Sequence, residues 1–384
     1  MGDSATVKAR TYGDFLNLTK EQTTKLKEFW KLVLDRLNNK QININEDNDK
    51  AVKNSSWRFS SVISRSYETQ EGLKISNKTG EELKSTLSKI IKCDHPDIKA
   101  IKYLIARKWK AKEAYKMFIN SLDYFSQDIH EQTFSIAQMN AFFYQKCKDG
   151  RLIMYIIASR CFASKYTIDD YLKFFLININ NSYLLLGNQA RMTVVLNMNG
   201  YTLANTDINH IKIMANLLPN HFPELMTKFI IHDAPWIFNS VWYVISPLFE
   251  QRTRDKLTFT QGEEIKKYID DKVLLKSLGG SDNFNYQYFP PSEKEGLPKA
   301  YDDNYLKLVE ERKDLIQSFE KLTYKWTESN DDQIKANRDE IGDQLASNYV
   351  KMSEYDFCKN IYHRLNVIQG YDNVNWVSLN ENRV

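Results

Sequence analysis

The sequence predicts an α/β fold with a mostly parallel sheet covered by helices, and three observations support this prediction. Short apolar and β-branched runs recur between turn signals, as strands do. These runs are apolar throughout rather than alternating, which is typical of strands buried on both faces. Predicted strands and helices also alternate along the chain, as they do in parallel sheets. The chain has 384 residues, of which 42% are hydrophobic and 27% charged, enough for two or three structural units around a substantial core.

The predicted strands lie in the middle of the chain, and helices stand between most of them. Asn205 is expected to cap the helix whose apolar stripe begins at Ile208. Pro235 and Pro247 are expected to mark the beginning and end of the helix between the last two strands. The predicted strands are residues 152–157, 193–198, 229–231 and 257–260, and a further helix is predicted over 169–186.

Helices are predicted on both sides of this central part. Thr19 and Gln22 have the spacing of a capping box at the start of the first helix. A polar stretch follows from residue 38 to about 80, and we interpret it as an exposed, partly disordered insert. Further helices are expected over 81–125, interrupted at 94–96, over 305–326 and over 332–365. We therefore divide the chain into residues 1–80, a helical subdomain at 81–130, a sheet domain at 131–281, and a linker with C-terminal helices at 282–384.

Composition excludes several classes of protein. The net charge of +4 is small, and the chain has no arginine-rich arm, so nucleic-acid binding is not expected. No apolar run is long enough to span a bilayer, so any membrane contact should be peripheral. The 4 cysteines are scattered without metal-ligand spacing, which favours a reducing cytosol. Aromatic residues make up 13% of the chain, which indicates either a crowded aromatic core or a lipid-lined cavity.

The segment from Trp236 to Pro247 is the most informative stretch of the sequence. It is apolar on every face, with polar breaks only at Asn239, Ser240 and Ser246. A helix of this kind must be deeply buried or face something other than water. It is also far shorter than the ~20 residues of a transmembrane helix. We therefore interpret it as a movable cover, or gate, over a hydrophobic cavity. The residues predicted to form the gate are Trp236, Phe238, Trp242 and Phe249.

The usual catalytic motifs of α/β proteins are missing. No glycine-rich nucleotide loop follows a predicted strand, and no GxSxG nucleophile elbow is present. His232 and Asp233 end a strand, a favoured catalytic position, but without a nucleophile we expect Asp233 to help start the next helix. His210, His221 and His232 are too widely spaced for one metal site. No enzyme activity, catalytic residue, cofactor or metal is therefore expected.

The order of several short motifs resembles the CRAL-TRIO lipid-transfer family, in particular a divergent branch of the yeast phosphatidylinositol-transfer proteins. The similarity covers about residues 83 to 281, and the leading helix, the patch at 55–57 and the C-terminal helices also resemble that branch. It implies a CRAL-TRIO fold in which a mobile gating helix covers a lipid cavity, with residues 131–281 as the lipid-binding domain. The motifs that carry the similarity are 96–98, 104–109, 148–151, 196–200, 222–224, 234–236 and 278–280.

The resemblance implies a site for the phosphatidylinositol headgroup. In members that bind this lipid, four residues meet the inositol phosphate, and their positions here hold Arg107, Glu224, Thr253 and Lys256. Arg107 and Lys256 can offset the phosphate charge through charge-assisted hydrogen bonds. Glu224 and Thr253 can bind ring hydroxyls or orient the cations. The alternative is an ordinary ion pair between Glu224 and Lys256.

A second lipid site departs from the family pattern. Members that bind phosphatidylcholine use two tyrosines, a serine and a threonine, whereas Phe143, Met154, Met192 and Val194 occupy those positions here. Burying a choline phosphate without polar partners would cost a few kcal/mol. The resemblance therefore implies an apolar second ligand, such as a sterol or a squalene-like molecule, in place of phosphatidylcholine.

The resemblance implies a cytoplasmic protein that binds and exchanges phosphatidylinositol at membrane surfaces, with microsomes, endosomes and lipid droplets as candidate membranes. One alternative is a sensor that presents the lipid to a phosphoinositide kinase, and a lipid esterase is a third. A basic cluster is either a solvated helix face or a surface for anionic membranes. Its members are Lys99, Lys102, Arg107, Lys108, Lys110 and Lys112.

Overall fold

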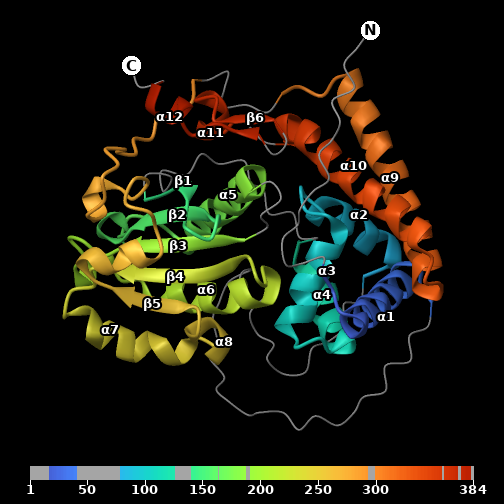
Figure 1. Cartoon of the computed structure of the whole chain (residues 1–384), viewed down its shortest axis with the longest axis horizontal. Coiled ribbons are helices and arrows are strands. Elements are labelled where there is room, and N and C mark those ends of the chain that lie inside the picture. The colour runs from blue at the N-terminus through green and yellow to red at the C-terminus, as the bar shows by residue number, and fades with distance from the viewer. Residues whose placement is uncertain are drawn as a thin grey trace.

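The centre of the molecule is a five-stranded sheet whose strands lie side by side in chain order, β1-β2-β3-β4-β5 (Figure 1). β1 is antiparallel to β2, and the remaining neighbours are parallel. The strands are β1 (Ala141–Lys146), β2 (Leu152–Ile157), β3 (Met192–Asn197), β4 (Met226–His232) and β5 (Leu257–Thr260). The computed structural model describes residues 17–40, 78–125, 140–162, 164–186, 191–292, 299–356, 359–370 and 373–381.

Three helices connect the parallel strands. α5 (Ile168–Leu186) joins β2 to β3, α6 (Ile208–His221) joins β3 to β4, and α7 (Phe238–Ile245) lies between β4 and β5. Crossover connections are right-handed, and all three run in the same direction across the sheet, so the helices cover one face. We call this the helix-covered face. The predicted α/β fold with a mostly parallel, helix-covered sheet is confirmed.

The register of the strands shows which side chains line the helix-covered face. Met154 pairs with Phe143 on one side and with Val194 on the other, and Val194 pairs with Phe229. Side chains two residues apart on a strand share a face, so Ile231 lies on this face as well. Phe229 and Ile231 belong to the apolar cluster of α7. The opposite face is covered in part by the chain after β5, where Tyr286 stacks on Phe142 with ring centroids 4.4 Å apart.

A helical subdomain lies beside the sheet (Figure 1). It contains α1 (Lys20–Leu37), α2 (Gly80–Ile90), α3 (Pro96–Ala106) and α4 (Ala111–Phe125). The C-terminal helix α9 (Asp303–Glu328) shares its core, because Phe319 and Trp326 pack with residues of α1, α3 and α4. α10 (Asp332–Asp356) follows α9 after a short turn and lies along it. Segments from the predicted regions 1–80, 81–130 and 282–384 therefore share one core.

The end of the chain returns to the sheet. This end contains α11 (Ile361–Arg364), the short strands β6 (Ile368–Gly370) and β7 (Asn373–Val374), and α12 (Ser378–Glu381). The buried hydroxyl of Tyr362 accepts a hydrogen bond from the backbone N–H of Phe143 at 2.6 Å and lies 3.3 Å from the Phe143 carbonyl. An edge strand exposes unpaired backbone groups, and Tyr362 satisfies those of β1 at this position.

Substituting Tyr362 with phenylalanine should lower the free energy of unfolding by about 1–3 kcal/mol, because buried backbone groups of Phe143 lose their partner. Denaturant unfolding followed by circular dichroism measures the change. Tyr301→Phe is the matched control: Tyr301 is exposed and stacks on Tyr305, so its variant should unfold like the original chain. Equal stability of both variants would contradict a structural role for the Tyr362 hydroxyl.

Several local predictions are confirmed. Thr19 and Gln22 form the predicted capping box, with the Gln22 N–H 3.2 Å from the Thr19 hydroxyl and the Thr19 N–H 2.9 Å from the Gln22 side chain. β2 and β5 have the predicted bounds. The predicted insert falls almost entirely on residues 41–77, which lie outside the described residues, as does the patch at 55–57.

Other local predictions are wrong. Asp207, not Asn205, caps α6, because its carboxylate accepts the N–H of His210 at 3.0 Å. Asn205 instead ends a short 3₁₀ helix, η6 (Leu203–Asn205). The block at 81–125 is interrupted twice, since residues 107–110 separate α3 from α4. The helix predicted over 332–365 divides into α10 and α11.

Candidate functional site

α7 has part of the burial that its sequence predicts. Phe238 and Ile245 are buried against the sheet, and Trp242 and Phe249 are half-buried beside them with ring centroids 6.3 Å apart. Trp236 precedes the helix and points outward, with 83% of its surface exposed. The helix is shorter than the predicted segment, and Pro247 lies in the following 3₁₀ helix η7 (Ser246–Leu248).

The outer surface of α7 is mixed: Asn239 and Ser240 face solvent together with two large apolar side chains. Tyr243 is 81% exposed and Val244 is 53% exposed, close to Trp236 in the chain. We call Trp236, Tyr243 and Val244 the outer gate surface. A contiguous exposed apolar patch is typical of a surface that meets a partner or a membrane, and these three side chains are candidates for such contact.

At the end of β4 the side chains of His232 and Asp233 lie beside each other, with Nε2 3.3 Å from Oδ2. His232 is fully buried, and its Nδ1 lies 3.0 Å from the hydroxyl of Thr260 on β5. Asp233 accepts the N–H of Gly262 at 2.9 Å, so it holds the loop that follows β5. The expectation that Asp233 helps to start α7 is wrong, because no side chain caps that helix.

A charged cluster lies where the gate segment ends. Glu224 stands in the loop before β4, Lys256 directly precedes β5, and Arg252 lies in the four-residue helix α8 (Gln251–Arg254). The Glu224 Oε1 atom is 2.7 Å from Arg252 Nη2 and 3.0 Å from Lys256 Nζ. Arg252 Nη1 also donates to the carbonyl of Ile105, at the end of α3, over 2.6 Å. These contacts join the gate segment, the sheet and the helical subdomain at one point.

The neighbouring cations keep the carboxylate of Glu224 ionised. Burial raises the pKa of Glu224. The positive charges of Lys256, Arg252 and Arg191 together lower it by more, so the pKa lies below its ordinary value. Burial lowers the pKa of Lys256, and the positive charges of Arg252 and Arg191 lower it as well. The negative charge of Glu224 raises it, but by less, so the pKa lies below its ordinary value. Lys256 is thus a cation whose charge is costly to bury and favours a further anion nearby.

The structure brings together some of the residues predicted to bind the headgroup. Glu224 and Lys256 form an ion pair, and Thr253 lies next to Arg252 on α8. Arg107 is half-buried at the end of α3, and within the described residues its side chain forms no ion pair with Glu224. Arg252 holds that position instead. Sequence reasoning missed Arg252 as a site residue, because its contact with Glu224 joins segments 28 residues apart.

The four residues predicted for the second ligand lie together. Phe143, Met154 and Val194 are neighbours across three strands, and Met192 lies two residues from Val194 on the same face. All four are buried. The helix-covered face is therefore apolar from β1 to β3 at this level, with no nitrogen or oxygen atom among these four side chains.

The predicted basic cluster is divided. Lys102 is buried and pairs with Asp94 at 3.0 Å, and Lys99 donates to the Tyr183 hydroxyl at 2.7 Å. Lys108, Lys110 and Lys112 are not buried. The interpretation of all six residues as one solvated face is wrong for Lys99 and Lys102, because both are held between α3 and α5.

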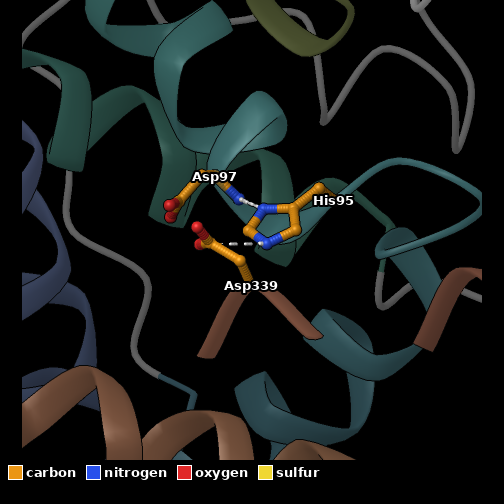
Figure 2. A group of neighbouring side chains, drawn as sticks. All are labelled: His95, Asp97 and Asp339. Atoms are coloured by element: carbon orange, nitrogen blue, oxygen red, sulfur yellow. Dashed lines mark hydrogen bonds and ion pairs between the residues drawn. The ribbon is translucent and has the colours of Figure 1, made fainter. Parts of the chain in front are cut away.

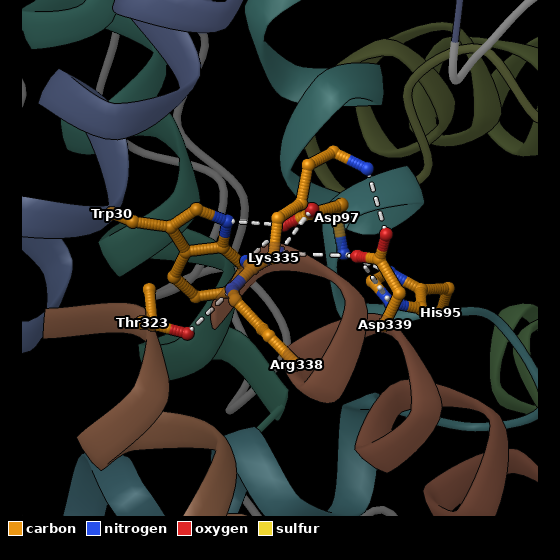
Figure 3. Close-up of polar contacts among 7 residues, drawn as sticks. All are labelled: Trp30, His95, Asp97, Thr323, Lys335, Arg338 and Asp339. Carbon is orange, nitrogen blue, oxygen red and sulfur yellow. Dashed lines mark hydrogen bonds and ion pairs between the residues drawn. The ribbon is translucent and has the colours of Figure 1, made fainter. Parts of the chain in front are cut away.

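A second polar group lies in the core of the helical subdomain. His95, Asp97 and Asp339 place possible metal-ligand atoms close together (Figure 2). However, Asp97 already accepts two hydrogen bonds from the buried guanidinium of Arg338 and one from Trp30 Nε1 (Figure 3). The positive charge of Arg338 disfavours a cation beside Asp97. The group fits a structural ion pair between α3 and α10.

The fold and this geometry define a class of protein: an α/β domain in which the short helix α7 packs against the sheet, preceded by a helical subdomain. Residues 138–280 match the family model of the CRAL/TRIO domain, and residues 70–120 match that of the CRAL/TRIO N-terminal domain. The chain belongs to the CRAL-TRIO family of lipid-binding and lipid-transfer proteins, which confirms the resemblance. Among the described helices, none has the length and apolarity needed to cross a membrane.

The chain is also similar over much of its length to individual proteins. The chain is 25% identical over 304 residues to CRAL-TRIO domain-containing protein C3H8.02 of Schizosaccharomyces pombe, covering 72% of this chain and 67% of that one. It is 24% identical over 302 residues to the phosphatidylinositol transfer protein CSR1 of Eremothecium gossypii, covering 71% and 68%. The crystal structure of Sfh5 aligns with a TM-score of 0.48 and 14% identity, over 70% of this chain and 89% of that chain.

Proposed function

We propose that this protein binds phosphatidylinositol, encloses one lipid molecule under α7 and exchanges it at cytoplasmic membrane surfaces. The observation that carries the proposal is the cluster of Glu224, Arg252 and Lys256 at the end of the gate segment, beside an apolar sheet face. The similarity to a phosphatidylinositol transfer protein supports the choice of lipid.

The energetics of exchange follow from these two features. Each methylene exposed to water costs about 0.8 kcal/mol, so a lipid needs a continuous apolar path between membrane and protein. An apolar sheet face can replace the bilayer interior, and tail burial is then nearly neutral between the two. The headgroup contacts decide which lipid is selected.

Lipid uptake requires α7 to move. Phe238 and Ile245 of α7 share one buried cluster with Met198, Tyr201 and Ile231. Acyl chains can therefore reach the sheet under α7 only when these contacts open. The outer gate surface supplies apolar side chains that can enter a bilayer and offset part of the cost of opening.

The second ligand is proposed to be wholly apolar, such as a sterol or a squalene-like molecule. Phe143, Met154, Met192 and Val194 offer no hydrogen bond to a choline phosphate, whose burial would cost a few kcal/mol. The protein should thus take up sterol from vesicles in preference to phosphatidylcholine.

The proposal predicts that phosphatidylinositol co-purifies with the protein and that Lys256→Ala reduces its binding by about tenfold or more. This is the effect of losing one charge-assisted hydrogen bond. Mass spectrometry of extracted lipids and transfer of labelled phosphatidylinositol between vesicles measure it.

Lys267→Ala is the matched control, since Lys267 is exposed and pairs only loosely with Glu264 at 3.8 Å. Its binding should match that of the original chain. If the protein carries and transfers no phosphatidylinositol, the proposed function is wrong.

A further inference from the structure

Arg252 occupies a position that connects three parts of the molecule. It stands four residues after η7, at the end of the segment that contains the gate. Its guanidinium donates through Nη1 to the Ile105 carbonyl of α3, and through Nε and Nη2 to Oε1 of Glu224, at 3.1 and 2.7 Å. Lys256 also forms an ion pair with Glu224, but its ammonium lacks the planar fork of donors that Arg252 has.

Two positively charged side chains contact the single carboxylate of Glu224. Arg252 and Lys256 both contact the same carboxylate oxygen, Oε1, and Glu224 is the acid of this group. The side chains of Glu224 and Lys256 are 9% and 21% exposed, so water screens their charges only in part, whereas Arg252, at 38%, can be reached by a ligand. Arg191 also lies close enough to influence Glu224 and Lys256. A single negative charge brought to this cluster would be stabilised.

We propose that Arg252 is a headgroup-selecting residue, which binds the phosphate of an anionic phospholipid in exchange for part of its contact with Glu224. This inference rests on the proposed function and deepens it. A phosphodiester has two non-bridging oxygens, and a guanidinium can bind both at once. Glu224, partly released, can then accept hydrogen bonds from hydroxyl groups of the headgroup.

The charges of Arg252, Lys256 and Glu224 also determine which class of lipid headgroup the cluster binds. A headgroup with a neutral polyol, as in phosphatidylinositol or phosphatidylglycerol, brings one negative charge and several hydroxyls. A choline or ethanolamine headgroup brings an additional cation beside Arg252 and Lys256, where like charges repel. The cluster thus selects anionic lipids with uncharged polyol headgroups.

The experiment compares Arg252→Lys and Arg252→Gln with the matched control Arg254→Gln. Arg254 lies on the same short helix but donates to the Phe249 carbonyl at 2.7 Å rather than to Glu224. Protein is incubated with phosphatidylcholine vesicles that contain labelled phosphatidylinositol, phosphatidylglycerol, phosphatidylethanolamine or sterol. Bound lipid is measured after reisolation, and thermal unfolding checks that each variant is folded.

Arg252→Gln should lower uptake of phosphatidylinositol and phosphatidylglycerol by about tenfold or more, the effect of one lost charged hydrogen bond, and leave sterol uptake unchanged. Arg252→Lys should restore only part of the loss, because an ammonium cannot bind two oxygens in a fork. Arg254→Gln should behave like the original chain.

Water-soluble competitors identify the source of the phosphate. Glycerophosphoinositol should compete with labelled phosphatidylinositol in the original chain and not in Arg252→Gln. If inorganic phosphate competes as strongly as glycerophosphoinositol, the cluster is a general phosphate site, and the selection of a lipid headgroup is overturned.

Two further outcomes would overturn the inference. Unchanged lipid selectivity in folded Arg252 variants would mean that Arg252 only joins α8 to α3. Equal loss of anionic lipids and sterol would point to the gate rather than to the headgroup. A failure of the proposed function is distinct from both, because the original chain would then bind no phosphatidylinositol.

Discussion

Asp97→Ala should lower the free energy of unfolding by about 3–5 kcal/mol, because it leaves the buried guanidinium of Arg338 without its carboxylate. Arg338 is 0% exposed and lies over the rings of Phe319 and Trp326, at 4.5 and 4.6 Å. Trp30 Nε1 also loses its acceptor, which lies 2.6 Å away. Denaturant unfolding of the purified variant measures the change.

Two further variants test the physical reason for this loss. Asp339→Asn is the matched control, because Asp339 is 33% exposed and lies 3.8 Å from the same guanidinium. Its effect should stay below about 1 kcal/mol. A double variant, Asp97→Leu with Arg338→Met, should recover much of the loss, since it removes both buried charges. A small effect of Asp97→Ala alone would contradict the account.

The pH dependence of this ion pair has a defined sign. Burial raises the pKa of Asp97, but the charge and hydrogen bonds of Arg338 lower it more, so the pKa lies below its ordinary value. The contribution to stability is present above about pH 4, the ordinary pKa of an aspartate, and is lost as the pH falls through the lower pKa of the folded state. The difference between Asp97→Ala and the original chain should therefore shrink in acid.

The sheet could be predicted wherever its strands are apolar and long. β2 and β5 have the predicted bounds because β-branched and aromatic runs end at clear turns. β1 was not identified, although it contains Phe142 and Phe143. It is an antiparallel edge strand, and much of its partner surface comes from residues more than a hundred positions later, such as Tyr286 and Tyr362. Local pattern carries no information about such partners.

The candidate site was predictable to the extent that family motifs fix single positions. Glu224 and Lys256 were identified in this way, and the structure places them 3.0 Å apart. The ion pair of Arg252 with Glu224 was not predicted, because it depends on how the loop before β4 faces α8. The pairing of Asp97 with Arg338 spans 241 residues and was missed for the same reason. Contacts between distant segments require the fold itself.

The outer gate surface leads to the second large expected effect. Replacing both Trp236 and Tyr243 with alanine should weaken binding to lipid vesicles by about a hundredfold. Burial of one large apolar side chain contributes about 1.5–3 kcal/mol, and each 1.4 kcal/mol changes an equilibrium tenfold. The folded protein should be little affected, because both side chains are more than four-fifths exposed, at 83% and 81%. Co-sedimentation with vesicles measures the binding.

Tyr301→Ala separates this effect from a general loss of surface aromatic residues. Tyr301 is exposed next to α9, which lies far from α7 in the molecule (Figure 1), and its variant should bind vesicles like the original chain. In the original chain, Trp236 fluorescence should shift to the blue on vesicle addition, as its ring leaves water. Lipid transfer should fall together with vesicle binding in the double variant, since the proposed opening of α7 takes place at the membrane. Unchanged vesicle binding with normal transfer would show that the exposed side chains of α7 do not enter the bilayer, and the proposed route of exchange would then have to avoid this surface.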